Sequence, residues 1–193
     1  NTNNLRNKIF IDLKDRNLNV NSANLQFDCC YEDISRIKNI ILNNNSDSVI
    51  AAGGGKVLDS GKYLADSLNI PCITVPLSAS TCAGWTALSN IYTKDGKFIK
   101  DVALGSCPKI LVYDHKFIQT APSRTLASGI ADALAKWYES SITSSTIDDG
   151  LVQQAIQISR VLRDQLLIDG EKAFKGQFEN NPSWRNTVEA CGL

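Results

Sequence analysis

The stretch SVIAAGGGK, residues 48–56, decides the fold predicted for this chain. Its apolar residues 48–52 predict a buried strand, and helical spacing begins directly after the glycines, from Val57 to Leu68. A strand that ends in a glycine turn and opens a helix can bind phosphate, because glycines let backbone N–H groups approach an anion at a helix N-terminus of partial positive charge. The stretch therefore indicates a nucleotide cofactor. It has neither the P-loop nor the Rossmann spacing, and a purely structural turn is the alternative.

The sequence around this turn alternates between strand and helix patterns. Helices are expected over residues 3–16, 31–42 and 56–69. Strands are expected near 18–20 and over 48–52, 72–75 and 109–114, with a hairpin turn over 94–97. This alternation predicts an α/β fold with a parallel, doubly wound sheet.

After Pro122 the spacing of the apolar residues changes, and only helical patterns follow. Ser123 is expected to cap a helix that runs to about Ser141. A second long helix, with apolar residues at helical spacing from Leu151 to Leu166, is expected to end near Gly170, and a third starts at 181–183. The predicted domains are therefore an α/β domain over 1–120, partial in this chain, and the start of a helical domain over 121–193.

The composition bounds the class of protein. The chain has 193 residues, a net charge of zero and 43% hydrophobic residues, so nothing indicates a nucleic-acid partner or an acidic membrane surface. No apolar run reaches the roughly 18 residues of a membrane-spanning helix. No signal-peptide pattern precedes the first predicted helix, and a cytoplasmic location with reduced cysteines is expected.

Two features of the ends suggest a longer protein. The sequence contains no methionine, and it runs from Asn1 to Leu193 with helical patterns at both ends. We expect it to be a piece, or the ordered part, of a longer chain.

Two further segments could carry chemistry. Small hydroxyl residues over 76–84 follow a predicted strand at the carboxyl edge of the sheet, where open α/β sheets bind ligands. On the helix over 123–141, Gly129 would leave room for a ligand or ion above Asp132. The alternatives are an ordinary Ser/Thr loop and a solvated surface pair of Asp132 with Lys136.

Other polar residues have simpler interpretations. Asp59 is expected to complement the dipole at the start of its helix. Lys56 and Lys62 are expected to be solvated, and His115 to lie in a loop after a strand. A single histidine cannot build a His-rich metal site.

Three stretches in series resemble the glycerol dehydrogenase branch of the iron-containing alcohol dehydrogenase superfamily. They are GGGKVLDSGKYLA at 53–65, PCITVPLSASTCAGWTALSNIYTKDG at 71–96 and APSRTLASGIADALAKWYES at 121–140. The superfamily also includes glycerol-1-phosphate dehydrogenase and dehydroquinate synthase. The resemblance implies a dinucleotide-binding α/β domain followed by a helical metal-binding domain.

The resemblance also implies roles for individual residues. NAD or NADP would be bound by Gly53, Gly54, Gly55, Lys56, Val57, Ser80, Thr81, Thr86, Leu88 and Tyr92, with the glycine turn at the pyrophosphate. Asp132 falls on the first ligand of a divalent metal, zinc or iron. The implied reaction transfers a hydride from a small alcohol or polyol to the nicotinamide, while the metal lowers the pKa of the substrate hydroxyl. The family also implies a homo-oligomer.

This chain departs from the family pattern at three places. The two histidine ligands of the metal would lie beyond Leu193, and the family's N-terminal strand is absent. Cys82 stands where glycerol dehydrogenases have an aspartate that contacts the substrate, which favours a less polar alcohol, or a polyol held differently, over glycerol. The alternatives are a glycerol-1-phosphate dehydrogenase or dehydroquinate synthase-like enzyme, and a nucleotide-binding module without catalytic activity.

Overall fold

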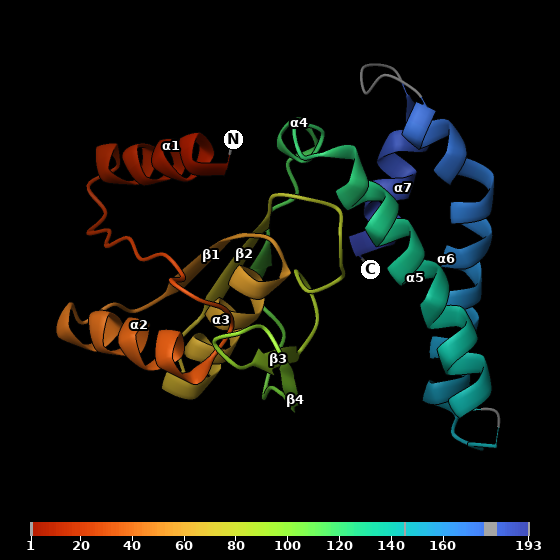
Figure 1. Cartoon of the computed structure of the whole chain (residues 1–193), viewed down its shortest axis with the longest axis horizontal. Helices are drawn as coiled ribbons and strands as arrows, with labels where there is room; N and C mark the ends of the chain where they lie inside the picture. The colour runs from red at the N-terminus through yellow and green to blue at the C-terminus, as the bar shows by residue number, and fades with distance from the viewer. Residues whose placement is uncertain (1, 145, 176–180, 193) are drawn as a thin grey trace. The chain divides into compact units, whose positions relative to one another are not determined.

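A computed structural model of the protein describes residues 2–144, 146–175 and 181–192. The chain forms two compact units. Unit 1 comprises Asn1–Leu77 and Ala83–Asp114, and unit 2 comprises Ser78–Cys82 and His115–Leu193. Figure 1 shows both units, with unit 1 in red to green and the helices of unit 2 in green to blue.

Unit 1 is an α/β unit built around a small parallel sheet. Its helices are α1 (Thr2–Asp15), α2 (Tyr31–Asn43) and α3 (Gly55–Leu68). Its strands are β1 (Val49–Gly53), β2 (Cys72–Pro76), β3 (Leu88–Tyr92), β4 (Phe98–Ala103) and β5 (Ile110–Leu111). The α/β class with a parallel sheet is confirmed, and helices α1, α2 and α3 begin and end within a residue of the predicted bounds.

The parallel sheet has the order β1-β2-β5. Strand β1 pairs with β2 from Val49↔Cys72 to Gly53↔Pro76, so both strands end at the same edge as the glycine turn. Strand β5 is shorter than the predicted strand over 109–114 and pairs with β2 only at Ile110 and Leu111. The predicted hairpin is confirmed, since β3 and β4 form an antiparallel pair.

The strand predicted near 18–20 is absent from the described structure. The backbone N–H of Leu18 donates to the carbonyl oxygen of Leu13 at 3.3 Å, so the segment closes the end of α1. The side chain of Leu18 is exposed. Local apolar residues suggested a strand, but the segment has no strand partner in the described part of the chain.

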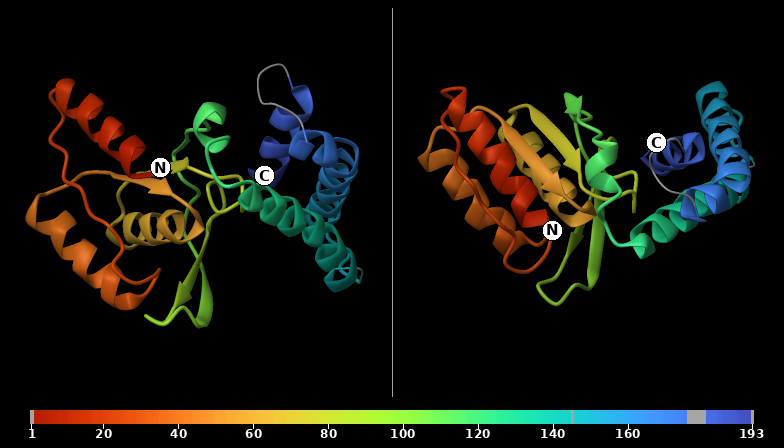
Figure 2. Two further views of the ribbon diagram at one scale, coloured as in Figure 1. Left: turned by 45° about the horizontal axis from the view of Figure 1, so that its top comes forward. Right: turned by 90° about the horizontal axis from the view of Figure 1, so that it is seen from above.

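Helix α3 packs closely on the sheet, as Figures 1 and 2 show. A Cβ atom at Gly61 would lie 2.4 Å from Cβ of Ala51 on β1, so only glycine permits this approach. On another side of α3, buried Leu64 joins Ile34 and Ile41 of α2 and Ile91 of β3 in one apolar cluster. Helix α3 therefore holds the sheet, α2 and the hairpin together.

Unit 2 is helical. Its helices are α4 (His115–Ile118), α5 (Ser123–Thr143), α6 (Gly150–Lys175) and α7 (Pro182–Gly192). Helices α5 and α6 run antiparallel, and α7 packs against both (Figures 1 and 2). The outer face of α6 carries exposed apolar side chains, among them Leu151, Ile158, Val161 and Ile168.

Two predicted helix ends in unit 2 are wrong. Ser123 is the first helical residue, Pro122 takes the N-cap position, and no side chain caps the helix. Gly170 is buried inside α6, where an added Cβ would lie 3.6 Å from Ile130 of α5. Packing on α5 and α7 offsets the cost of about 1 kcal/mol that glycine imposes inside a helix.

Two chemical findings concern the described residues as a whole. All six cysteines are free thiols, as expected for reduced cysteines. Among the helices that the structure describes, none is both long and apolar enough to cross a membrane.

Replacing Gly61 should destabilise the protein. We expect Gly61→Ala to lower the free energy of unfolding by about 2 kcal/mol, because the new methyl group forces α3 away from β1. Gly150→Ala is the control, since a Cβ at Gly150 meets no atom within 4 Å. Urea denaturation measures both variants, and an unchanged midpoint for Gly61→Ala would contradict the packing described here.

Candidate functional site

The glycine turn lies at the junction of β1 and α3 in unit 1. Gly53 is the last residue of β1, Gly54 is the N-cap of α3 with an extended backbone (φ −84, ψ −178), and Gly55 is the first helical residue. The N–H groups of Gly55 and Lys56 make no hydrogen bond within the described residues. The turn therefore presents two N–H donors at the positive end of a helix dipole, which suits a phosphate group.

The first two glycines of this turn differ in what surrounds them. A Cβ at Gly53 would lie 2.6 Å from Cβ of Val57, so Gly53 allows Val57 to pack over the turn. A Cβ at Gly54 would meet no atom within 4 Å. Gly54 therefore borders open space, where a ligand could approach the backbone closely.

The side chain of Lys56 is held by unit 1 itself. Its ammonium pairs with the buried carboxylate of Asp28 and lies 5.2 Å from the ring centre of Tyr92. The structure thus brings together two of the residues predicted to bind the cofactor, Lys56 and Tyr92. Asp28 neutralises the charge of the ammonium, and the backbone of the turn offers further donors in the two N–H groups.

Lys62 and Asp59 form a buried ion pair on α3, contrary to the simpler interpretations of both residues. Their side chains are 1% and 8% exposed, and Lys62 Nζ lies 3.0 Å from Asp59 Oδ1. Burial raises the pKa of Asp59, and the Lys62 ammonium offsets part of that rise. The i,i+3 spacing on one helix is the signal that could have predicted this pair.

Lys62 also positions two residues predicted to bind the cofactor. Its ammonium donates to the carbonyl oxygen and to Oγ1 of Thr86, both at 3.1 Å, and to the carbonyl oxygen of Leu88. Asp59 in turn accepts the N–H of Asn90 at 3.3 Å. The start of β3 is therefore fixed to α3 by charged hydrogen bonds.

The other predicted residues lie in unit 2, which includes the segment Ser78–Cys82. Ser80 Oγ lies 3.0 Å from Ser78 Oγ, and Thr81 and Cys82 are half-buried. A Cβ at Gly129 would lie 1.7 Å from the carbonyl oxygen of Ala79. The interpretation that Gly129 leaves room for a ligand is therefore wrong, because the backbone of this segment fills that space.

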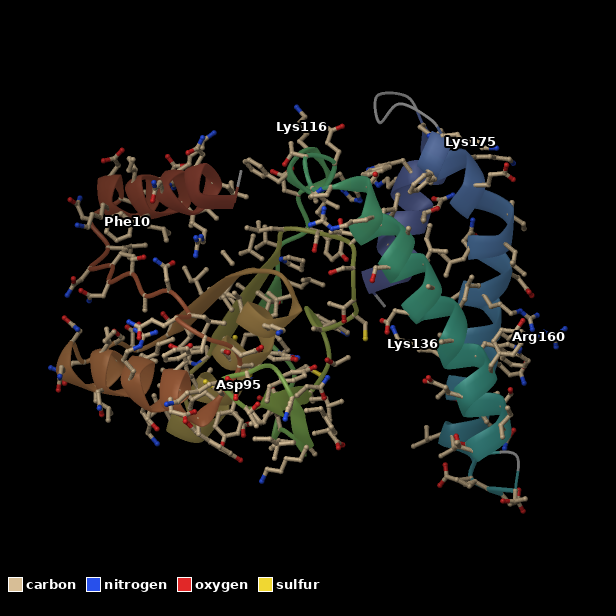
Figure 3. All side chains as sticks on the ribbon, in the orientation of Figure 1. Phe10, Asp95, Lys116, Lys136, Arg160 and Lys175 are labelled. Atoms are coloured by element: carbon tan, nitrogen blue, oxygen red, sulfur yellow. The ribbon has the colours of Figure 1, made fainter. Side chains whose placement is uncertain are left out.

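Asp132 and Lys136 lie one turn apart on α5, and Figure 3 shows Lys136 leaving that helix. Asp132 Oδ2 lies 3.4 Å from Lys136 Nζ, and the Asp132 side chain is 49% exposed. The Lys136 side chain is 31% exposed, although its ammonium nitrogen itself is inaccessible to solvent, so the pair is partly solvated. Burial lowers the pKa of Lys136, but the neighbouring Cys82 and Asp132 raise it further than burial lowers it.

Asp132 by itself fits the role of one metal ligand. No described hydrogen bond or ion pair uses its Oδ1, so that oxygen is available. Among the residues that the structure describes, no group of three or more His, Cys, Asp or Glu residues could hold a metal ion. His115 begins α4, not a loop as predicted, and its Nε2 lies 3.5 Å from Glu189. A complete metal site thus needs ligands other than the residues that the structure describes.

A pocket of about 180 Å³ lies elsewhere on unit 1. It is lined by residues from the end of α3 and from 106–109, including Asp66, Asn69 and Cys107. No residue predicted to bind a cofactor, substrate or metal lines it.

Comparison with known proteins gives a consistent result. A family model described as iron-containing alcohol dehydrogenase matches residues 2–115. An uncharacterized oxidoreductase of Synechocystis is 40% identical over 166 residues, which cover 86% of this chain and 43% of that protein. A glycerol dehydrogenase of Escherichia coli is 34% identical over 184 residues, which cover 92% of this chain and 50% of that enzyme.

A solved structure supports the same relationship. The crystal structure of a probable glycerol dehydrogenase from Sinorhizobium meliloti superposes with a TM-score of 0.83 at 29% identity. The match covers 96% of this chain and 56% of that chain. The chain thus spans about half the length of these relatives.

Removing the cation of the buried pair should destabilise the protein in a pH-dependent way. We expect Lys62→Met to cost about 3 kcal/mol at pH 7, because Asp59 is left as a buried, unpaired charge. Since the pKa of Asp59 is raised in the folded state, its ionisation opposes folding as the pH rises above about 4. The loss should therefore shrink when the pH falls and Asp59 takes up a proton.

Urea denaturation at several pH values measures this loss. Lys94→Met is the matched control, because Lys94 pairs with Glu32 at 3.5 Å with both side chains half exposed. If both variants lowered the free energy of unfolding equally at every pH, the buried Lys62–Asp59 pair would contribute no more to stability than an exposed pair.

Proposed function

The chain belongs to the iron-containing alcohol dehydrogenase family, and from this membership we propose that the whole protein is a metal- and NAD(P)-dependent dehydrogenase of a small alcohol or polyol. The observation that carries the proposal is the glycine turn. It presents two free N–H groups at the start of α3 beside open space, as a dinucleotide pyrophosphate requires. The chain covers about half of its relatives, so the activity is proposed for the full-length protein.

We assign the two units of this chain to the two binding tasks. Unit 1 would bind NAD or NADP through the backbone of Gly53, Gly54, Gly55, Lys56 and Val57, with Thr86, Leu88 and Tyr92 as further contacts. Lys62 would keep Thr86 and Leu88 in place. Ser80 and Thr81 of unit 2 would lie toward the nicotinamide, which accepts the hydride when the cofactor is bound.

Unit 2 would supply one ligand of a divalent metal, zinc or iron. Asp132 has an available oxygen, and two histidines elsewhere in the full-length protein would complete the site. Such a metal, when bound, lowers the pKa of a substrate hydroxyl. Asp132 would contribute a negative charge that holds the metal. The half-buried segment that contains Cys82 packs against α5, the helix that carries Asp132.

Two alternative functions stay open to test. A glycerol-1-phosphate dehydrogenase or a dehydroquinate synthase-like enzyme would act on phosphorylated substrates. A nucleotide-binding module would bind NADH tightly with neither bound metal nor turnover. We also propose a homo-oligomer in the cytoplasm, which size-exclusion chromatography and cell fractionation would test.

The cofactor role of the glycine turn predicts a selective binding defect. In Gly54→Ala, the dissociation constant for NADH should rise at least tenfold, or about 1.4 kcal/mol, because the methyl group occupies space that the pyrophosphate needs. The variant should fold normally, since the added Cβ meets no protein atom. NADH fluorescence titration measures the change, with Gly150→Ala as control, and unaltered affinity would argue for a structural turn.

The metal role of Asp132 predicts loss of metal and turnover together. In the full-length protein, Asp132→Asn should lower the metal content measured by atomic emission and reduce NADH formation with small alcohols at least a hundredfold. Asp164→Asn on α6 is the control, because Asp164 is exposed and pairs only with its neighbour Arg163 in the described structure. Metal-free wild-type protein that still binds NADH would instead support the non-catalytic alternative.

A further inference from the structure

Helix α6 of unit 2 carries large apolar side chains that the described structure leaves exposed. Leu151, Ile158, Val161 and Ile168 are 77, 61, 65 and 62% exposed. Single exposed apolar side chains are common on protein surfaces and need no explanation. These four lie in one row along the helix, and a row of this kind is typical of an interaction surface.

The row has the spacing of a helix–helix seam. Alternating steps of three and four residues lead along α6 through six residues, which we call the outer stripe: Leu151, Gln154, Ile158, Val161, Gln165 and Ile168. Residues at this spacing share one face of a helix, so the outer stripe is continuous over about 26 Å. Buried Ile156 and Gly170 lie on the opposite face, where α6 packs against α5 and α7 (Figures 1 and 2).

Charge is excluded from the outer stripe but not from the rest of the helix. The other faces of α6 carry Arg160, Arg163 and Asp164, and Lys172 takes the position that follows Ile168 in the row. Apolar residues at heptad spacing, with a few uncharged polar ones among them, form the seam between two packed helices. The outer stripe therefore suits a second helix and not solvent.

The outer stripe also matches its own reverse. Its side chains run apolar, amide, apolar, apolar, amide, apolar, and this order is the same from either end. Two copies of α6, packed antiparallel around a two-fold axis at the middle of the stripe, would place Ile158 opposite Val161. The same axis would place Leu151 opposite Ile168 and Gln154 opposite Gln165. In such an isologous interface each of these pairs occurs twice.

The polar groups fit this arrangement too. The side-chain amide nitrogen of Gln165 donates to Asp169, and no hydrogen bond in the described structure uses its amide oxygen. That oxygen is available to accept from Gln154 of another copy. Beside the stripe, Gln157 would lie opposite Asp164, so no like charges meet there.

We propose that the outer stripe of α6 is a contact surface between two copies of this chain, which pack through it as an antiparallel helix pair. A second copy is favoured over a different partner because the stripe is matched by its own reverse at all six positions. This surface would serve the homo-oligomer proposed above, and it is independent of the cofactor and metal roles. A stripe about 26 Å long on a helix about 10 Å wide is smaller than the roughly 800 Å² per partner of a standard interface. Contact through the stripe alone should therefore be reversible on dilution.

Sedimentation velocity of the full-length protein over a range of concentrations tests the surface. Leu151→Glu and Ile168→Lys should each weaken self-association at least tenfold, because each sets a charge against an apolar side chain twice in the pair. Far-UV circular dichroism should be unchanged, since both replaced side chains are exposed. Leu167→Glu is the matched control, because Leu167 is 66% exposed on α6 but lies outside the stripe and should leave self-association unaltered.

The double variant Leu151→Glu with Ile168→Lys tests the antiparallel register. In the proposed pair, each new carboxylate at position 151 faces a new ammonium at position 168 of the other copy. The two positions are about 26 Å apart along one helix, so these charges cannot pair within one copy. The double variant should self-associate at least tenfold more tightly than either single variant, and 1 M salt should remove this recovery.

Two results would overturn the proposed surface. The first is a double variant that associates no better than the single variants, or a Leu167→Glu variant that dissociates as they do. The second is a full-length protein whose mass does not respond to Leu151→Glu, which would mean that another part of the protein or solvent covers the stripe. An oligomer that persists in that case would keep the proposed homo-oligomer and assign it to another surface.

Discussion

The buried ion pair of Lys62 with Asp59 is the interaction on which unit 1 depends. Its two charges are removed from water, so they are stable only while each has several partners. Lys62 finds these partners in the residues that lead into β3, and Asp59 finds one more in the backbone of Asn90. The pair therefore forces α3, the glycine turn at its start and the hairpin of β3 and β4 to keep one arrangement. Positions that are predicted to bind the cofactor, and that lie far apart in the sequence, are held on one unit by this constraint.

Unit 2 uses a different constraint for the same purpose. Gly129 has no side chain, and the backbone of Ala79 occupies the space where a Cβ would lie. This close approach attaches the segment Ser78–Cys82 to α5, although that segment follows a strand of unit 1 in the sequence. It sets Cys82 beside Lys136 and Asp132 on one surface.

Local sequence patterns predicted much of the fold, because most helices and strands have apolar residues at their characteristic spacing. Helices α2 and α3 have apolar residues at helical spacing, and the hairpin has a glycine at its turn, so their bounds could be predicted closely. The errors share one physical cause. Leu18 was assigned to a strand without knowledge of a pairing partner, and Gly170 was assigned to a helix end without knowledge of the packing that carries α6 through it. Whether a strand or a helix continues depends on distant contacts.

The sequence alone determined the glycine turn, the order of strands and helices, and the family, because these depend on the residues present and their spacing. The cofactor and metal roles of individual residues remain predictions from that family pattern. Only the tertiary structure decided the state of each charge. Lys62 and Lys136 have ordinary helical spacing to an aspartate, and both resembled solvated surface residues. Burial makes Lys62 a structural link between α3 and β3, whereas the Lys136 side chain stays partly exposed beside Asp132, because the cost of removing a charge from water depends on what surrounds it in three dimensions.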